Sequence, residues 1–485
     1  MSKSNLSAIE LAKKIHQGET TAVELTQQAL DAIDATDDRV NAYISVTADL
    51  ALKKAAEVDK RIKAGDIRSP LAGIPIGIKD NLCLAGTKTT CASTMLENFV
   101  SPYTATAVQR ILDADLIPVG KCNMDEFAMG SSTEHSAFST TKNPFNCDYV
   151  PGGSSGGSAA TVAARQVMLS LGSDTGGSIR QPAAYCGVVG LKPTYGRISR
   201  YGLVAFASSL DQIGPFSRTV EDSAHLLTLI AGHDDHDSTS LQQAVPQFSD
   251  ALVDDIHGLK IAVPAELFGE SIDPEVLESV KKALEVYVSM GATYEIVSME
   301  SFKAALASYY VIAPAEASAN LARFDGVRYT HRTSESESLK EMITRSRSEG
   351  FGDEVKRRIL IGTFVLSAGY YDAYYGKALK ARRVIKNEFD RVFHDYDVIL
   401  SPTTPTTAFK FGQHSDNPVQ MYLNDIATIP ANMAGLPALS IPCGVHNGLP
   451  IGMQLVGKAL DEATLFRMGY AYQQHTSIPE LEVAL

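Results

Sequence analysis

The sequence lacks the marks of several protein classes. No stretch approaches the roughly 20 consecutive apolar residues that a membrane span requires, and the polar segment from Met1 to Glu10 holds no apolar signal region. Tryptophan is absent too, which excludes nothing by itself. Hydrophobic residues make up 45% and charged residues 20% of the 485 residues, the balance of a globular protein with a substantial core. We therefore expect a cytoplasmic protein with no membrane attachment.

The chain also lacks a block of lysine and arginine. Its formal net charge is −13, from 43 basic and 56 acidic residues. A protein that binds a phosphate backbone by itself usually carries a basic stripe. We therefore expect that the chain does not bind tRNA or other nucleic acid directly. If RNA is involved, we expect a partner subunit to bind it.

Cysteines are few and scattered. None of the six forms a C-x-x-C pair, and no close Cys/His cluster has the spacing of metal ligands. The segment His233-Asp234-Asp235-His236-Asp237 could be drawn as a metal site, but a solvated acidic loop is the commoner explanation of such a composition. We expect reduced, mostly buried thiols and no metal.

The order of the polar and apolar patterns indicates an α/β fold. Residues 1–65 are expected to be mainly helical, because Ser7 and Thr21 each stand three residues before a glutamate, which is the capping-box pattern. A further helical run ends near Gly65. Beyond Leu71, short apolar stretches alternate with helical runs. The expected strands are 73–78, 116–120, 259–263 and 397–400, and the expected helices are 106–114 and 274–290. No linker divides the chain, so one large domain is predicted over residues 1–485.

Two segments rich in glycine and serine, 151–158 and 172–180, could carry chemistry together with Lys79. A serine hydroxyl is a poor nucleophile until a base takes its proton. Neither segment holds a histidine, and the nearest, His135, lies 19 residues before Ser154. A lysine can be that base if burial keeps it neutral. Lowering its pKa from about 10.4 to roughly 7–8 costs on the order of 3–5 kcal/mol of ammonium solvation.

The backbone N–H groups of residues 175–178 have no bulky side chains around them and could form an oxyanion hole. Gly-Ser loops are, however, more often turns or phosphate cradles than catalytic loops. The G-K-[ST] end of a P-loop is missing, and so is the G-x-S-x-G of a nucleophile elbow. By themselves, the two segments are candidate anion or oxyanion sites.

Residues 152–158 and 174–183 together resemble, without a gap, the long motif of the amidase signature family. The resemblance implies a Ser–Ser–Lys triad, with Lys79 as base, Ser154 as relay and Ser178 as nucleophile. It also implies a cis Gly153–Ser154 peptide bond and a single domain with a mixed central sheet flanked by helices, whose core motifs lie in residues 71–215. The oxyanion hole would be formed by Thr175, Gly176, Gly177 and Ser178.

Residues 127–134, 191–197 and 435–438 resemble one branch of that family, the A subunits of glutamyl-tRNA(Gln) amidotransferases, and the resemblance runs from about Ser7 to Tyr472. It implies a glutaminase subunit that supplies ammonia to a tRNA-binding partner. The partner uses ATP and Mg²⁺ to amidate Glu-tRNA(Gln), related complexes act on Asp-tRNA(Asn), and a small third subunit completes the assembly. No cofactor is expected in this chain.

Glutamine carries an ammonium and a carboxylate, so its pocket needs an anion and a cation. The resemblance assigns these to Asp425 and Arg358, with Tyr309 preferred over Tyr310 as a lining residue. Gly130 and Ser131 are further candidates. Charged residues chosen blindly are mostly surface ion pairs, which is the plain alternative for Asp425 and Arg358.

Two other functions compete with the glutaminase. The first is a stand-alone amidase acting on small amides, which the charged pair Arg358 and Asp425 argues against. The second is a non-catalytic scaffold subunit with the same fold, which the intact Lys79, Ser154 and Ser178 argue against.

Overall fold

In the computed structural model, which describes residues 6–414, 418–477 and 483, eleven strands form one mixed sheet. Their order is β1-β3-β2-β4-β6-β5-β10-β11-β9-β7-β8. The strands are β1 Tyr43–Val46, β2 Pro75–Lys79, β3 Ile117–Cys122, β4 Leu169–Asp174, β5 Val189–Lys192, β6 Gln212–Ser217, β7 Lys260–Pro264, β8 Thr293–Val297, β9 Val398–Pro402, β10 Ala438–His446 and β11 Leu449–Gly457.

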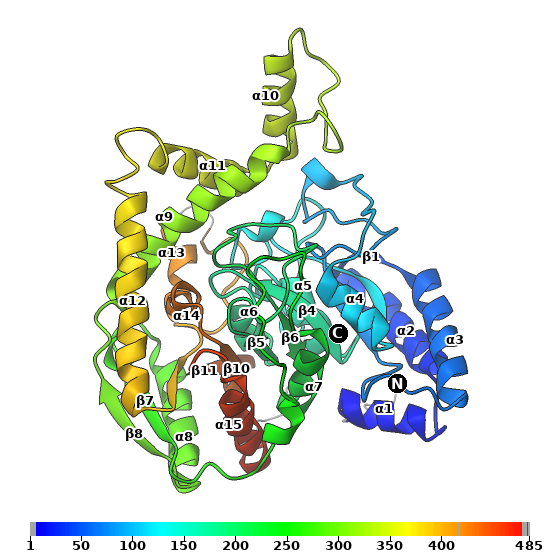
Figure 1. Cartoon of the computed structure of the whole chain (residues 1–485), viewed down its shortest axis with the longest axis vertical. Helices are drawn as coiled ribbons and strands as arrows, with labels where there is room; N and C mark the ends of the chain where they lie inside the picture. Colours follow the sequence, from blue (N-terminus) through cyan, green and yellow to red (C-terminus); the bar gives the residue numbers. More distant parts are fainter. Residues whose placement is uncertain (1–5, 415–417, 478–482, 484–485) are drawn as a thin grey trace.

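Helices flank this sheet. They are α1 Ala8–His16, α2 Ala22–Val40, α3 Ala48–Lys63, α4 Thr106–Asp113, α5 Gly156–Ala163, α6 Arg180–Tyr185, α7 Val220–Ile230, α8 Pro274–Ser289, α9 Phe302–Asn320, α10 Leu339–Gly350, α11 Asp353–Val365, α12 Tyr375–Asp395, α13 Pro418–Leu423, α14 Ile429–Ala434 and α15 Glu462–His475. Figure 1 shows α1, α2 and α3 on one side of the molecule and α9, α11 and α12 on the other, with α10 projecting beyond α11. The mixed, helix-flanked sheet expected from the sequence is confirmed.

The N-terminal helices begin where the sequence predicts. Ser7 and Thr21 each accept a hydrogen bond from the glutamate three residues on, and both capping boxes are complete. The expectation of a mainly helical flank missed one element, β1, which pairs antiparallel with β3 at the sheet edge. Four residues are too few to show an alternating pattern, so pairing with β3 decides their conformation.

The sheet topology brings two motifs to one edge. Strands β2 and β4 run parallel, with Ile78 opposite Leu171, so their carboxyl ends point the same way. Lys79 ends β2, and Asp174 ends β4 directly before the glycine-rich turn. Both strands are fully buried and apolar at alternate positions, which fixes their register. The lysine and the serine-bearing turn therefore lie side by side.

Within the described residues, no helix is long and apolar enough to cross a bilayer.

Candidate active site

The amine of Lys79 lies among hydroxyl groups at the carboxyl end of β2. Its Nζ is 2.8 Å from Ser154 Oγ, 2.7 Å from Ser155 Oγ and 3.0 Å from Ser173 Oγ. The side chain is fully buried, and among the residues described no carboxylate pairs with it. The structure thus brings Lys79 and Ser154 together as predicted, and it adds Ser155 and Ser173, two contacts that sequence reasoning missed.

Burial shifts the protonation of this lysine. An ammonium loses its hydration in the interior, and this lowers the pKa of Lys79 to about 7, against the opposing charges of Asp125, Asp174 and Asp211. A large fraction of the amine is therefore neutral near pH 7, the state in which a lysine can accept a proton from serine.

The two serines of the predicted triad lie on adjoining turns. The Gly153–Ser154 peptide bond is cis, as the family resemblance implies. Ser155 N donates to the carbonyl of Ser178 at 3.2 Å, which joins the turns, and Ser178 is 8% exposed. In the described chain no hydrogen bond joins the hydroxyls of Ser154 and Ser178. Such catalytic bonds are often long before substrate binds, and the relay step stays a prediction.

The segment 175–178 leaves its backbone N–H groups free. Among the described residues, none of these four groups donates to an acceptor of the chain, whereas the carbonyls of Gly176 and Gly177 accept from Thr428 Oγ1 and Gln181 N at 2.7 and 2.8 Å. The segment is therefore held through its carbonyl groups. Its N–H groups remain available to an oxyanion, as the sequence predicts.

Glycine is required at both central positions of this segment. A Cβ on Gly176 would meet the Tyr309 ring at 2.7 Å. Gly177 has φ +150°, and a Cβ there would lie 2.3 Å from Thr428 Oγ1 and 3.0 Å from Asp425 Oδ1. The absence of side chains thus lets residues from two distant parts of the chain approach the turn of Ser178, the predicted nucleophile.

A buried ion pair braces the same turn, and sequence reasoning missed it. Arg180 donates to both oxygens of Asp174, each at 3.1 Å, and also to the carbonyl of Thr428 and to Gln454. Asp174 additionally accepts from Ile179 N. Burial opposes ionisation of Asp174, but Arg180 outweighs it and the pKa of Asp174 falls to about 2. This pair closes the segment 174–180 into a rigid loop.

Asp425 lies at this loop with one oxygen unused. Ser131 Oγ donates to Asp425 Oδ2 at 2.5 Å, whereas Asp425 Oδ1 is buried and has no partner among the described residues. Burial raises the pKa of Asp425 to about 7. A buried acceptor without a donor is costly, and an ammonium group would supply the missing donor.

Arg358 lies on the buried face of α11. Its Nε donates to Glu354 at 2.8 Å, and its guanidinium is surrounded by the rings of Phe206, Tyr310 and Tyr422 at 5.4–5.6 Å. Burial works against its charge, but Glu354 and the tyrosines outweigh this and raise the pKa of Arg358. No acceptor for its two terminal nitrogens occurs in the described chain. They are available to a carboxylate.

Arg358 and Asp425 are 3% and 7% exposed, so they are not the surface ion pairs of the plain alternative. Both tyrosines considered for the pocket are near it. Tyr309 faces Gly176, and Tyr310 stacks on Tyr422 beside Arg358, with 3.9 Å between the ring centres of the two tyrosines. Tyr309 and Tyr310 differ in what they contact, which a doublet in the sequence cannot show.

Gly130 allows its turn to pack closely against Asp125, because glycine has no side chain. A Cβ there would lie 2.4 Å from the carboxyl carbon of Asp125, so glycine lets the turn carrying Ser131 pack onto that buried acid. Asp125 also donates its N–H to the carbonyl of Ser154. The turn of Ser131 and the turn of Ser154 are thereby linked.

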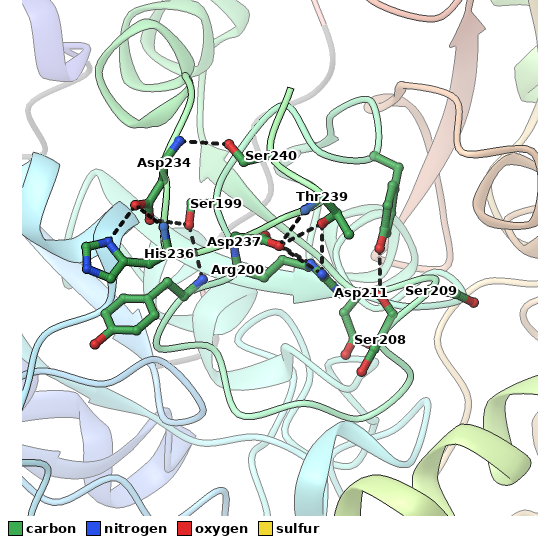
Figure 2. A network of polar contacts seen from close by, with 12 residues as sticks. Ser199, Arg200, Ser208, Ser209, Asp211, Asp234, His236, Asp237, Thr239 and Ser240 are labelled. Atoms are coloured by element: carbon green, nitrogen blue, oxygen red, sulfur yellow. Dashed lines mark hydrogen bonds and ion pairs between the residues drawn. The ribbon is translucent and has the colours of Figure 1, made fainter. Parts of the chain in front are cut away.

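Two aspartates of the His233–Asp237 segment are bonded to other side chains of the protein. Asp234 accepts from Thr106, Ser199 and His236, and Asp237 pairs with Arg200, as Figure 2 shows for the residues it labels. Across the described residues, no group of three or more His, Cys, Asp or Glu side chains could hold a metal ion.

Surface pockets do not by themselves locate the site. A pocket of about 720 Å³ is lined by Arg165 and Arg218 and includes none of the predicted site residues. A pocket of about 540 Å³ beside α11 is lined by Glu354, Arg357 and Met421, next to the Arg358 cluster. The second pocket therefore adjoins the candidate site.

Comparison with known proteins agrees with this geometry. The family model described as Amidase matches residues 24–466. The glutamyl-tRNA(Gln) amidotransferase A subunit of Desulforamulus reducens is 56% identical over 476 residues, 98% of each chain. The protein of the same name from Halalkalibacterium halodurans is 56% identical over 485 residues, 99% of this chain and all of the relative.

Solved structures show the same fold. The glutamyl-tRNA(Gln) amidotransferase A subunit of Thermotoga maritima superposes with a TM-score of 0.82 at 44% identity, covering 99% of this chain and 98% of the other. The peptide amidase of Stenotrophomonas maltophilia superposes with a TM-score of 0.85 at 31% identity over the whole of both chains. The resemblance drawn from the motifs is confirmed, and the chain belongs to the amidase family.

Proposed function

We propose that this chain is the glutaminase subunit of a tRNA-dependent amidotransferase. The proposal rests on two groups at this site. Among the residues that the structure describes, Asp425 Oδ1 at the loop of Ser178 has no hydrogen-bond donor, and the terminal guanidinium nitrogens of Arg358 have no acceptor. A buried anion and a buried cation beside an amidase nucleophile fit an amide substrate with an ammonium at one place and a carboxylate at another. The names of the relatives at 56% identity support the same conclusion.

The proposed reaction uses these groups and the triad that the family resemblance implies. Ser178 Oγ attacks the side-chain carbonyl carbon of glutamine, and its proton passes through Ser154 Oγ to the neutral amine of Lys79. The carbonyl oxygen becomes an oxyanion that the N–H groups of residues 175–178 stabilise. Collapse of the tetrahedral intermediate returns the proton to the leaving nitrogen, so ammonia departs and an acyl-enzyme remains.

Water then takes the place of ammonia. Lys79 removes its proton through the same hydroxyl, the hydroxide adds to the acyl carbon, and glutamate leaves as the proton returns to Ser178 Oγ. The step needs no metal and no redox partner to balance, so we expect no cofactor in this chain. ATP and Mg²⁺ would act on a partner subunit that amidates Glu-tRNA(Gln) or Asp-tRNA(Asn), with a small third subunit in the assembly and a cytoplasmic location.

The net charge of −13 supports this division of labour, because a partner would then hold the tRNA. The test is an assay of the chain co-expressed with the partner subunits of its source. Glutamate release from glutamine, with and without aminoacyl-tRNA, should be high only for the assembled complex. Turnover of simple amides by the isolated chain, without turnover of glutamine, would support the stand-alone amidase instead.

A further inference from the structure

Asp211 lies directly before β6, and its carboxylate joins two segments of the active site. Thr175 Oγ1 donates to Asp211 Oδ1 at 2.7 Å. The backbone N–H groups of Phe206 and Ala207 donate to Asp211 Oδ2 at 2.9 and 3.0 Å. The carboxylate is buried, and in the described chain no lysine, arginine or histidine pairs with it. Hydrogen bonds alone hold this charge in place.

Each of the two segments has a part in the chemistry. Thr175 begins the loop whose N–H groups face the developing oxyanion. Phe206 lies against the Arg358 guanidinium, with 5.6 Å from the carbon of that group to the ring centre. Asp211 therefore holds the oxyanion loop through one oxygen and a wall of the Arg358 pocket through the other.

The turn that carries these contacts is fixed from outside as well. Figure 2 shows Ser208, Ser209 and Asp211 beside Arg200, which donates to the carbonyl of Ser208. Glu316 accepts from the N–H and the hydroxyl of Ser209 at 2.8 and 2.6 Å. The outer side of the turn is held in this way. On the inner side, Asp211 accepts the N–H of Phe206, and Asn320 Nδ2 donates to the carbonyl of Phe206 at 3.1 Å.

We propose that Asp211 is a positioning residue of the amidase reaction, which sets the distance between the oxyanion loop, through Thr175, and the carboxylate-binding Arg358, through Phe206. A substrate bound at Arg358 then presents its carbonyl oxygen to the N–H groups of residues 175–178. The Arg358 half of this inference rests on the proposed function. The Thr175 half depends only on the amidase chemistry of the family.

The main test is Asp211→Asn in the assembled complex. Asparagine has one acceptor oxygen in place of two, so it cannot accept from all three donors, which are Thr175 Oγ1 and the N–H groups of Phe206 and Ala207. We expect kcat for glutamine hydrolysis to fall on the order of 100-fold, the size of a lost oxyanion contact, and KM to rise about tenfold. A folded variant whose kcat and KM stay within about twofold of wild type would overturn the proposal.

Asp222→Asn is the matched control. Asp222 is another buried carboxylate that accepts backbone N–H groups, those of Ala8 and Ile9 at 3.0 Å each, but it lies on α7 and bonds the start of α1. We expect a similar fall in the thermal midpoint for the two variants and a change in kcat and KM for Asp211→Asn alone. Equal kinetic losses in both would reduce Asp211 to a purely structural role.

A second variant keeps the test open if Asp211→Asn fails to fold. Thr175→Val preserves the shape of the side chain and removes the hydroxyl that Asp211 accepts. It should lower kcat about tenfold with little change in KM, because the Phe206 contacts remain. Where both single variants fold, the double variant should lose less than the product of the two losses; full multiplicativity would contradict a shared contact.

A serine-directed fluorophosphonate probe separates this inference from the proposed function. The probe reacts with Ser178 without needing Arg358 or Asp425, so its labelling rate measures the nucleophile and the oxyanion loop independently of the glutamine pocket. We expect Thr175→Val and Asp211→Asn to label at least about tenfold more slowly than wild type. If the wild type labels but does not hydrolyse glutamine, the proposed substrate is wrong, and unchanged labelling rates in the variants would overturn the positioning role.

Discussion

Asp425 Oδ1 lies 3.0 Å from the position that a Cβ on Gly177 would occupy, one residue before the proposed nucleophile Ser178. The group proposed to select the substrate's ammonium therefore touches the loop on which the chemistry takes place. Substrate selection and alignment for attack depend on the same contact, and each can be tested separately.

Asp425→Asn should impair the use of glutamine and spare the use of free ammonia. The change removes a buried charge-assisted hydrogen bond worth about 1.5–3 kcal/mol, so KM for glutamine should rise roughly 10- to 150-fold. The measurement is amidation of aminoacyl-tRNA by the complex with either donor. Equal losses with glutamine and with ammonium chloride would argue against a glutamine-binding role.

Ser178→Ala should abolish glutamine hydrolysis, with a loss of at least ~10³-fold, since no acyl-enzyme can form. The side chain is slightly exposed, and its hydroxyl makes no contact in the described chain on which folding depends. The thermal midpoint should therefore stay within a few degrees of wild type. Retained turnover in a purified, folded variant would remove the mechanism.

Lys79→Arg should be as inactive as Ser178→Ala. A guanidinium stays protonated at any physiological pH and cannot accept the proton of Ser154. The arginine side chain is also larger than the lysine that the hydroxyls of Ser154, Ser155 and Ser173 surround. Glutamate release by the complex measures the effect, and a normal pH–rate profile in this variant would show that another group is the base.

The pH dependence of kcat/KM for glutamine should show the titration of two groups, Lys79 and Asp425. Lys79 has a pKa lowered to about 7, so the neutral base is present above pH 7 and is lost as the pH falls. Asp425 has a pKa raised to about 7, so the anion that binds ammonium is likewise lost below pH 7. Log kcat/KM for glutamine should therefore fall below pH 7 with a slope near two.

The variant Asp425→Asn separates these two titrations. Because Lys79 is then the only one of these two groups left to titrate, the slope of log kcat/KM should drop to about one. The profile of kcat at saturating glutamine should have that slope already in the wild type, since a bound ammonium keeps Asp425 ionised. An unchanged slope of two in the variant would assign the second titration to another residue.

The sequence predicted the local elements well where the local chemistry decides them. The hydroxyl–glutamate pairs at Ser7 and Thr21 predicted the first helices, and the apolar stretch before Lys79 predicted β2. It missed β1, whose residues 43–46 become a strand only because β3 offers them an edge. The proposed triad and glutamine pocket came from motif resemblance and not from spacing, because Lys79, Arg358 and Asp425 are far apart in the chain.

Other parts of the site could not be found from the sequence for a physical reason. Asp211 stands in an ordinary polar turn, and only the fold brings its carboxylate to Thr175 and Phe206. The brace between Asp174 and Arg180 lies inside the motif, but a pair six residues apart gives no sign that both partners are buried. Tertiary burial, not composition, turns such residues into parts of a site.

Asp425 Oδ1, which has no hydrogen-bond partner among the described residues, would couple the binding of glutamine to the release of protons. With a pKa near 7, this carboxyl group holds a proton in about half of the unliganded molecules at neutral pH. An arriving ammonium favours the ionised form, so each binding event expels roughly half a proton into the solvent. Calorimetric titration with glutamine in two buffers of different ionisation enthalpy should give different apparent heats. Acidification would then raise the KM for glutamine, and saturating glutamine would overcome the effect.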